Sequence, residues 1–106
     1  MKTIYHNKLV RDKIPEIISY AGKQAVTRVL RDEEYLAELD RKLTEECVEY
    51  QADKSIEEMA DVLEVLYAIA EARGYSVEEL ERVRAAKAEK RGGFADRIFL
   101  EKVVEN

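Results

Sequence analysis

Hydrophobic residues recur at helical intervals through the middle of the chain. From about Asp32 they follow one another every three or four positions, which is the repeat of one face of an α-helix. The members of this first stripe are Leu36, Leu39, Leu43, Cys47 and Tyr50. The mostly polar segment 51–55 ends the stripe. A second apolar pattern runs from about Ile56 to Arg73, followed by Gly74 as a helix-ending glycine. The pattern predicts two long helices joined by a short turn.

Two further helices are expected on either side of this pair. Ser76 and Glu79 have the spacing of a capping box, so a third long helix begins there and ends before Gly92. An apolar pattern beginning at Ile14, just before Pro15, predicts one short helix near the N-terminus. Because short connections favour antiparallel neighbours, we expect an all-α, antiparallel helical bundle, with residues 1–106 as a single domain.

Two segments outside the helical pattern are rich in β-branched residues. They are "AVTRVL" at residues 25–30 and "RIFLEKVV" at residues 97–104. Such composition is typical of strands, and the two segments predict a short two-stranded β ribbon formed by the ends of the chain.

Composition excludes several classes of function. The net charge of −5 is unlike the basic surface that general nucleic-acid binding needs. The one cysteine, Cys47, lies on the first apolar stripe, where we expect it in the core, and it cannot form a disulfide framework. Residues 1–13 lack the apolar segment of a signal peptide, and the uncharged run at residues 65–70 is too short to span a membrane. We expect a cytoplasmic protein that binds neither membrane nor nucleic acid.

The acidic residues of the first long helix differ in direction. At 100° per residue, Glu46 lies roughly 60° from the centre of the apolar stripe and Glu49 roughly 120°, both on the same flank. Their spacing of three residues allows the two carboxylates to converge. Glu45 lies almost opposite the stripe and is expected in solvent.

The second long helix separates its acids more sharply. A solvent-facing stripe, spaced by seven residues, contains Glu57, Glu64 and Glu71. Glu58 instead falls within the apolar arc, and Asp61 lies at the edge of that arc. Because buried carboxylates that face one another repel, a divalent cation would stabilise them. The alternative is structural, since Ser55 and Glu58 also have the spacing of a capping box.

Ligands that are all oxygen favour a hard cation. Mg²⁺ suits such a site, and Mn²⁺ is a close substitute. Zinc and di-iron sites are disfavoured because the sole histidine, His6, lies outside both long helices. No arrangement of serine, histidine or cysteine for covalent catalysis is present.

The combination of E-E-x-x-E with E-x-x-D on the next helix resembles the all-α nucleoside triphosphate pyrophosphohydrolases. This group includes the MazG-type enzymes and phosphoribosyl-ATP pyrophosphohydrolase. The similarity covers most of the chain, through "YHNKLVRDKIPEII", "EEYLAELDRKLTEECVEY", "EEMADVLEVLYAIA" and "KAEKRGGF". Only eight residues separate Glu49 from Glu58, fewer than is usual in the family, so the helical hairpin must turn tightly.

The resemblance implies an activity and a site. The activity is Mg²⁺-dependent cleavage of a nucleoside triphosphate between its α and β phosphorus atoms, giving a monophosphate and pyrophosphate, in nucleotide house-cleaning. The implied metal ligands are Glu46, Glu49, Glu58 and Asp61. Hydrolysis would then use metal-activated water, with Glu49 or Glu46 taking the proton. Lys87 and Arg91 match the basic end of the third long helix in the family, where Lys87 would act in catalysis and both would bind phosphate, although either could instead serve only the helix end. Lys8 and Arg11 form a basic patch that is a further candidate for substrate binding.

The resemblance also implies a homodimer or homotetramer, in agreement with an apolar arc on the second long helix that is too broad for one chain to cover. Two alternatives stay open. One is phosphoribosyl-ATP hydrolysis in histidine biosynthesis, and the other is a non-catalytic helical oligomerisation or metal-sensing module.

Overall fold

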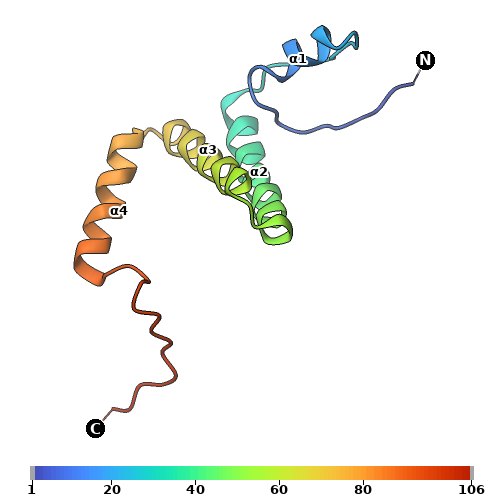
Figure 1. Cartoon of the computed structure of the whole chain (residues 1–106). Coiled ribbons are helices and arrows are strands. Elements are labelled where there is room, and N and C mark those ends of the chain that lie inside the picture. The colour runs from blue at the N-terminus through green and yellow to red at the C-terminus, as the bar shows by residue number, and fades with distance from the viewer. Residues whose placement is uncertain (1, 106) are drawn as a thin grey trace.

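Two long helices form an antiparallel hairpin at the centre of the molecule (Figure 1). The computed structural model describes residues 2–105. Helix α2 (Asp32–Asp53) ends at Lys54, whose N–H still donates to the carbonyl of Tyr50 and whose left-handed backbone turns the chain out of the helix. Helix α3 (Ile56–Ala72) begins after Ser55, whose Oγ accepts the N–H of Glu58. The chain therefore reverses within two residues, which confirms the predicted tight turn.

The flanking helices also lie close to their predicted positions. Helix α1 (Ile14–Tyr20) begins with a proline in its first turn, and α4 (Val77–Arg91) begins with a complete capping box between Ser76 and Glu79. Gly74 has a φ of +91°, a conformation that favours glycine after a helix. All four helices of the described residues are α-helices, so the all-α prediction is confirmed.

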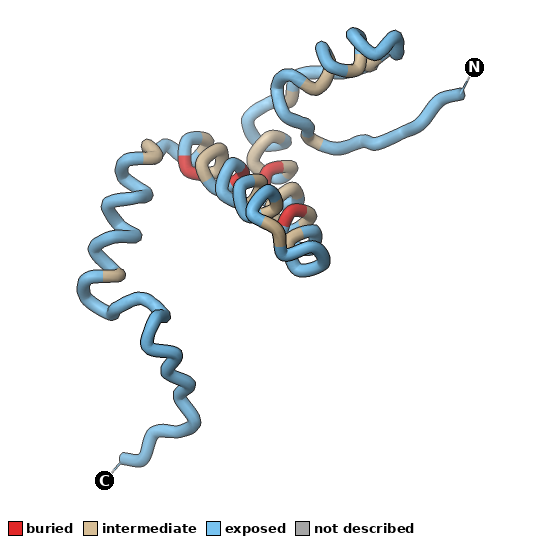
Figure 2. Tube along the Cα trace, viewed as in Figure 1, coloured by how far each residue is buried: buried red, intermediate tan, exposed pale blue. Residues whose placement is uncertain are grey.

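Most of the packing between helices of the described chain lies within the hairpin. Helix α4 contacts α3 but not α2 and projects away from the hairpin, whereas α1 packs on no other helix (Figure 1). The buried apolar residues of the described chain, Leu39, Val65 and Ala70, all lie on the hairpin (Figure 2). The molecule extends over 70 × 31 × 24 Å and leaves much of the apolar arc of α3 exposed, Ile56 and Leu63 included.

The predicted β ribbon is wrong for this structure. Residues 25–30 and 97–104 contain no strand, and they lie at opposite ends of the molecule (Figure 1). A strand needs the backbone groups of a neighbour, and α4 carries the second segment away from the first. The side chains of Val26 and Val29 are accordingly exposed. The composition of each segment favours a strand, but it does not show whether the two segments lie close enough to pair.

The predicted burial of Cys47 is also wrong. Leu39, on the same stripe, is buried, whereas Cys47 is exposed. The thiol lines a shallow groove of about 230 Å³ together with Tyr50, Gln51, Met59 and Val62. The apolar stripe of α2 is therefore only partly covered by its neighbour. None of the described helices has the length and apolar content needed to cross a membrane.

Candidate metal centre

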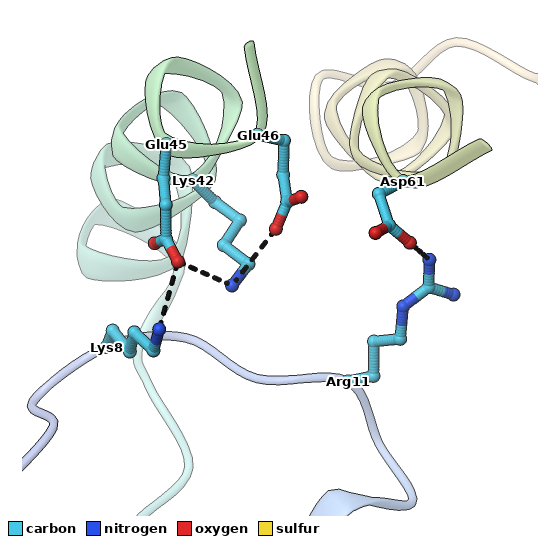
Figure 3. A network of polar contacts seen from close by, with 6 residues as sticks. All are labelled: Lys8, Arg11, Lys42, Glu45, Glu46 and Asp61. Atoms are coloured by element: carbon cyan, nitrogen blue, oxygen red, sulfur yellow. Dashed lines mark hydrogen bonds and ion pairs between the residues drawn. The ribbon is translucent and has the colours of Figure 1, made fainter. Parts of the chain in front are cut away.

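Three carboxylates meet across the hairpin. Glu46 comes from α2, and Glu58 and Asp61 come from the first turns of α3. Each offers an oxygen that lies within 4.8 Å of the oxygens of the other two. The arrangement follows from the tight turn, which brings the last turns of α2 beside the first turns of α3. Figure 3 shows Glu46 and Asp61 on the two facing helices.

Two of these carboxylates are held where ionisation is unfavourable. Glu46 is only 7% exposed, and its Oε2, like the Oε2 of Glu58, is buried without a hydrogen-bond partner among the described residues. Burial, followed by the charge of Glu49, raises the pKa of Glu46, although Lys42 at 3.4 Å opposes the shift. Burial, followed by the charge of Asp61, raises the pKa of Glu58. A cation between these oxygens would offset both the burial and the repulsion.

The side chain of Glu58 is not used in capping its helix. The Oγ of Ser55 accepts the N–H of Glu58 at 3.3 Å, but the carboxylate of Glu58 does not return a bond to Ser55. By contrast, Ser76 and Glu79 on α4 make both halves of the box. Helix capping, the structural alternative, therefore accounts for the backbone N–H of Glu58 but not for its carboxylate. That carboxylate is free to join the cluster. Glu57, Glu64 and Glu71 are exposed, as predicted.

Glu49, the fourth predicted ligand, lies outside the three-carboxylate cluster. Its side chain is exposed, yet it is close enough to Glu46 for its charge to raise the pKa of that residue. The structure thus brings three of the four predicted acids together and places Glu49 beside them on the solvent side. This position is better suited to exchanging a proton with water than that of the buried Glu46.

The N-terminal segment carries its basic side chains to both helices. Lys8 Nζ lies 3.0 Å from Glu45 Oε1 on α2, and Arg11 donates to Asp61 Oδ1 on α3 at 2.6 Å (Figure 3). The ion pair with Lys8 holds the pKa of Glu45 below its usual range, and Glu45 is half-buried, although its direction on the helix predicted solvent. Both basic residues were predicted to bind substrate, and here each contacts an acid.

Lys42 is a member of this site that the sequence interpretation missed. Its Nζ lies 3.5 Å from Glu45 and 3.4 Å from Glu46. The available signal was its spacing from Glu46, since residues four apart on a helix are neighbours.

Lys87 and Arg91 lie on the projecting helix. Both side chains are exposed, and α4 makes no packing contact with α2. Within one chain, the structure does not bring these two predicted substrate-binding residues to the acids.

Comparisons with known proteins do not assign the chain to a family. No family model matches the chain, and no solved structure matches it. A stretch of 45 residues, 42% of the chain, is 53% identical to a protein of Mycolicibacterium smegmatis that is described as uncharacterized. The matched stretch spans about half of that relative, 46% of its length.

Proposed function

We propose that the protein is a Mg²⁺-dependent nucleoside triphosphate pyrophosphohydrolase that acts in nucleotide house-cleaning, similar to the MazG-type enzymes. The observation that carries this proposal is the three-carboxylate cluster of Glu46, Glu58 and Asp61. Two of its oxygens are buried without a partner among the described residues, and its members stand within 4.8 Å of one another. An all-oxygen donor set of this kind fits Mg²⁺ or Mn²⁺.

The cluster would hold the cation, and the neighbouring residues would do the remaining work. When bound, the cation supplies charge neutralisation for the polyphosphate and acidifies the attacking water. Glu49 is exposed and close enough to Glu46 to act on its pKa, and it would accept the proton from water. Lys8 and Arg11 pair with Glu45 and Asp61, beside and within the cluster, and from there they would bind the phosphates.

We further propose that the protein functions as a homodimer or homotetramer in the cytoplasm. The chain exposes 10147 Å² of surface. A folded monomer of its mass exposes about 6,100 Å². The excess is larger than the roughly 800 Å² that each partner buries in a standard interface. Assembly would cover the apolar arc of α3, and it offers the route by which Lys87 and Arg91 of one chain reach the acids of another.

A non-catalytic metal-sensing module is the second candidate. It is favoured by one observation, which is that Lys87 and Arg91 lie on a helix that does not pack against α2. Such a module would bind the cation but release no pyrophosphate. Phosphoribosyl-ATP hydrolysis is a variant of the main proposal, and substrate choice alone separates the two.

Pyrophosphate release tests the proposal directly. The protein is assayed with canonical and modified nucleoside triphosphates and with phosphoribosyl-ATP, in Mg²⁺ and in EDTA. We expect release that EDTA abolishes, and a loss of at least ~100-fold in turnover for Glu58→Gln or Asp61→Asn, since each removes an electrostatic stabiliser. Glu57→Gln and Glu64→Gln change exposed acids of the same helix and should retain activity. Specific Mg²⁺ binding without release from any substrate would support the sensing module instead.

A further inference from the structure

The N-terminal segment crosses the open side of the hairpin between its two helices. Lys8 pairs with Glu45 on α2, and Arg11, three residues on, pairs with Asp61 on α3 (Figure 3). Three residues of non-helical chain reach about 10 Å. Packed helices lie about 8–10 Å apart, so this short length suffices to bridge them. We call residues 8–11 the strap.

Only one end of the strap pairs with an acid of the three-carboxylate cluster. Asp61 belongs to the three-carboxylate cluster, whereas Glu45 does not. Arg11 therefore contacts one of the carboxylates that would hold a cation, and Lys8 contacts a carboxylate beside the cluster. A guanidinium and a divalent cation on the same carboxylate would repel each other.

We propose that the strap is an autoinhibitory contact in which Arg11 competes with the divalent cation for Asp61, and that binding of the cation releases Arg11 toward the phosphates of the substrate. This inference rests on the proposed function, because it assumes that the cluster binds a metal. It assigns Arg11 a second contact in addition to substrate binding. Lys8 would keep the segment attached to α2 while the Arg11 end moves.

The exposure of the ion pair makes such an exchange feasible. The side chains of Arg11 and Asp61 are 55% and 36% exposed. Ion pairs in contact with solvent are weak, so a cation held by three carboxylates can displace the guanidinium. A competitor of this strength lowers the apparent metal affinity of the protein by about fivefold at most.

Metal affinity is the quantity that tests the strap. Mn²⁺ binding is measured by electron paramagnetic resonance of the free ion, on the full chain without nucleotide. Arg11→Gln should tighten Mn²⁺ binding up to about fivefold. Lys8→Gln removes the same charge at the other end of the strap and leaves Asp61 occupied, so its effect should be clearly smaller. Equal tightening by the two variants would indicate a general effect of charge and would overturn the proposal.

Arg28 provides a distant control for the loss of an arginine ion pair. It pairs with Glu34 at 3.0 Å, about 18 Å along α2 from Glu46. This separation exceeds the screening length of about 10 Å at 0.1 M salt. Arg28→Gln should therefore bind Mn²⁺ as the unmodified protein does.

Nuclear magnetic resonance gives a second readout that does not depend on activity. The guanidinium Nε–H signal of Arg11, identified by its loss in Arg11→Gln, should shift during titration with Mg²⁺, while the signal of Arg28 stays in place. An unmoved Arg11 signal at saturating Mg²⁺ would overturn the proposal.

The same data separate the failure of the strap from failure of the metal centre. If Asp61→Asn binds Mn²⁺ as well as the unmodified protein, the metal centre fails, and the strap proposal fails with it. If Asp61→Asn loses binding but Arg11→Gln does not tighten it, only the strap proposal fails.

Discussion

At the scale of single residues, the burial of Glu46 affects both the pKa of its carboxylate and the stability of the protein. A carboxylate that is 7% exposed, with one unpartnered oxygen, is poorly stabilised when charged. Lys42 compensates in part, but burial and the charge of Glu49 together raise the pKa of Glu46. Near neutral pH this residue therefore lowers the stability of the protein, and shifted pKa values of this kind are frequent at functional sites.

Replacing Glu46 by Gln should stabilise the protein in EDTA at neutral pH. Because the folded pKa lies above the unfolded one, the unfolded state binds fewer protons between these two values, and stability falls as pH rises through that window. Melting temperatures of Glu46→Gln and the unmodified protein should be similar near pH 4, diverge as the pH rises from the unfolded to the folded pKa of Glu46, and stay apart at pH 7.

Two comparisons make this prediction specific. Glu57→Gln changes an exposed acid and should show no such divergence. Mg²⁺ should raise the melting temperature of the unmodified protein by mass action and leave that of Glu46→Gln almost unchanged. A lower melting temperature for Glu46→Gln in EDTA at pH 7 would show that the ion pair with Lys42 outweighs the burial of Glu46.

At the scale of elements, the start of α3 fixes the site. The cap made by Ser55 orients the first turn of the helix, which carries Glu58, and Asp61 follows three residues later. The preceding residue, Lys54, has a left-handed φ of +56° that reverses the chain. The turn and the cap together set which residues of α3 face Glu46.

Ser55→Ala should lower the free energy of unfolding by about 1 kcal/mol, because the N–H of Glu58 loses its acceptor. Urea denaturation monitored by circular dichroism measures this change. Ser55→Asp keeps an acceptor at the cap and should retain most of the stability. Ser19→Ala, within the short α1, should have little effect, because α1 packs on no other helix. A loss for Ser55→Asp as large as that for Ser55→Ala would exclude capping as the cause.

The features that could be predicted from sequence are those that depend on local structure. Helix limits follow from apolar spacing and from caps such as Ser76 with Glu79, and the directions of Glu57 and Glu58 follow from helix geometry. The ion pair between Arg11 and Asp61 joins residues fifty positions apart, and no local pattern encodes it. The exposure of Cys47 likewise depends on how far α3 covers α2.

At the scale of the whole molecule, the amount of exposed surface is the dominant feature. The chain has a radius of gyration of 18.9 Å. A compact chain of this length has a radius of about 13 Å. Leu63 and Leu66 on α3, and Val83 on α4, are apolar residues left in solvent. A hairpin with so few buried side chains is poorly stabilised alone, which supports the proposed assembly of several copies.

The projecting α4 leads to a prediction about how a site is shared. If Lys87 of one chain serves the acids of its partner, Glu58→Gln and Lys87→Ala damage different chains of the same site. A mixed dimer then retains one intact site. Refolding the two inactive variants together at equal amounts should restore about one quarter of normal pyrophosphate release, since half of the dimers are mixed and each has one working site. Native mass spectrometry measures the fraction of mixed assemblies.

Co-refolding Glu58→Gln with Asp61→Asn supplies the matched control, because both acids lie on α3 and no combination restores a complete cluster. Activity in that control, or none in the first mixture despite mixed dimers, would exclude a site shared in this way.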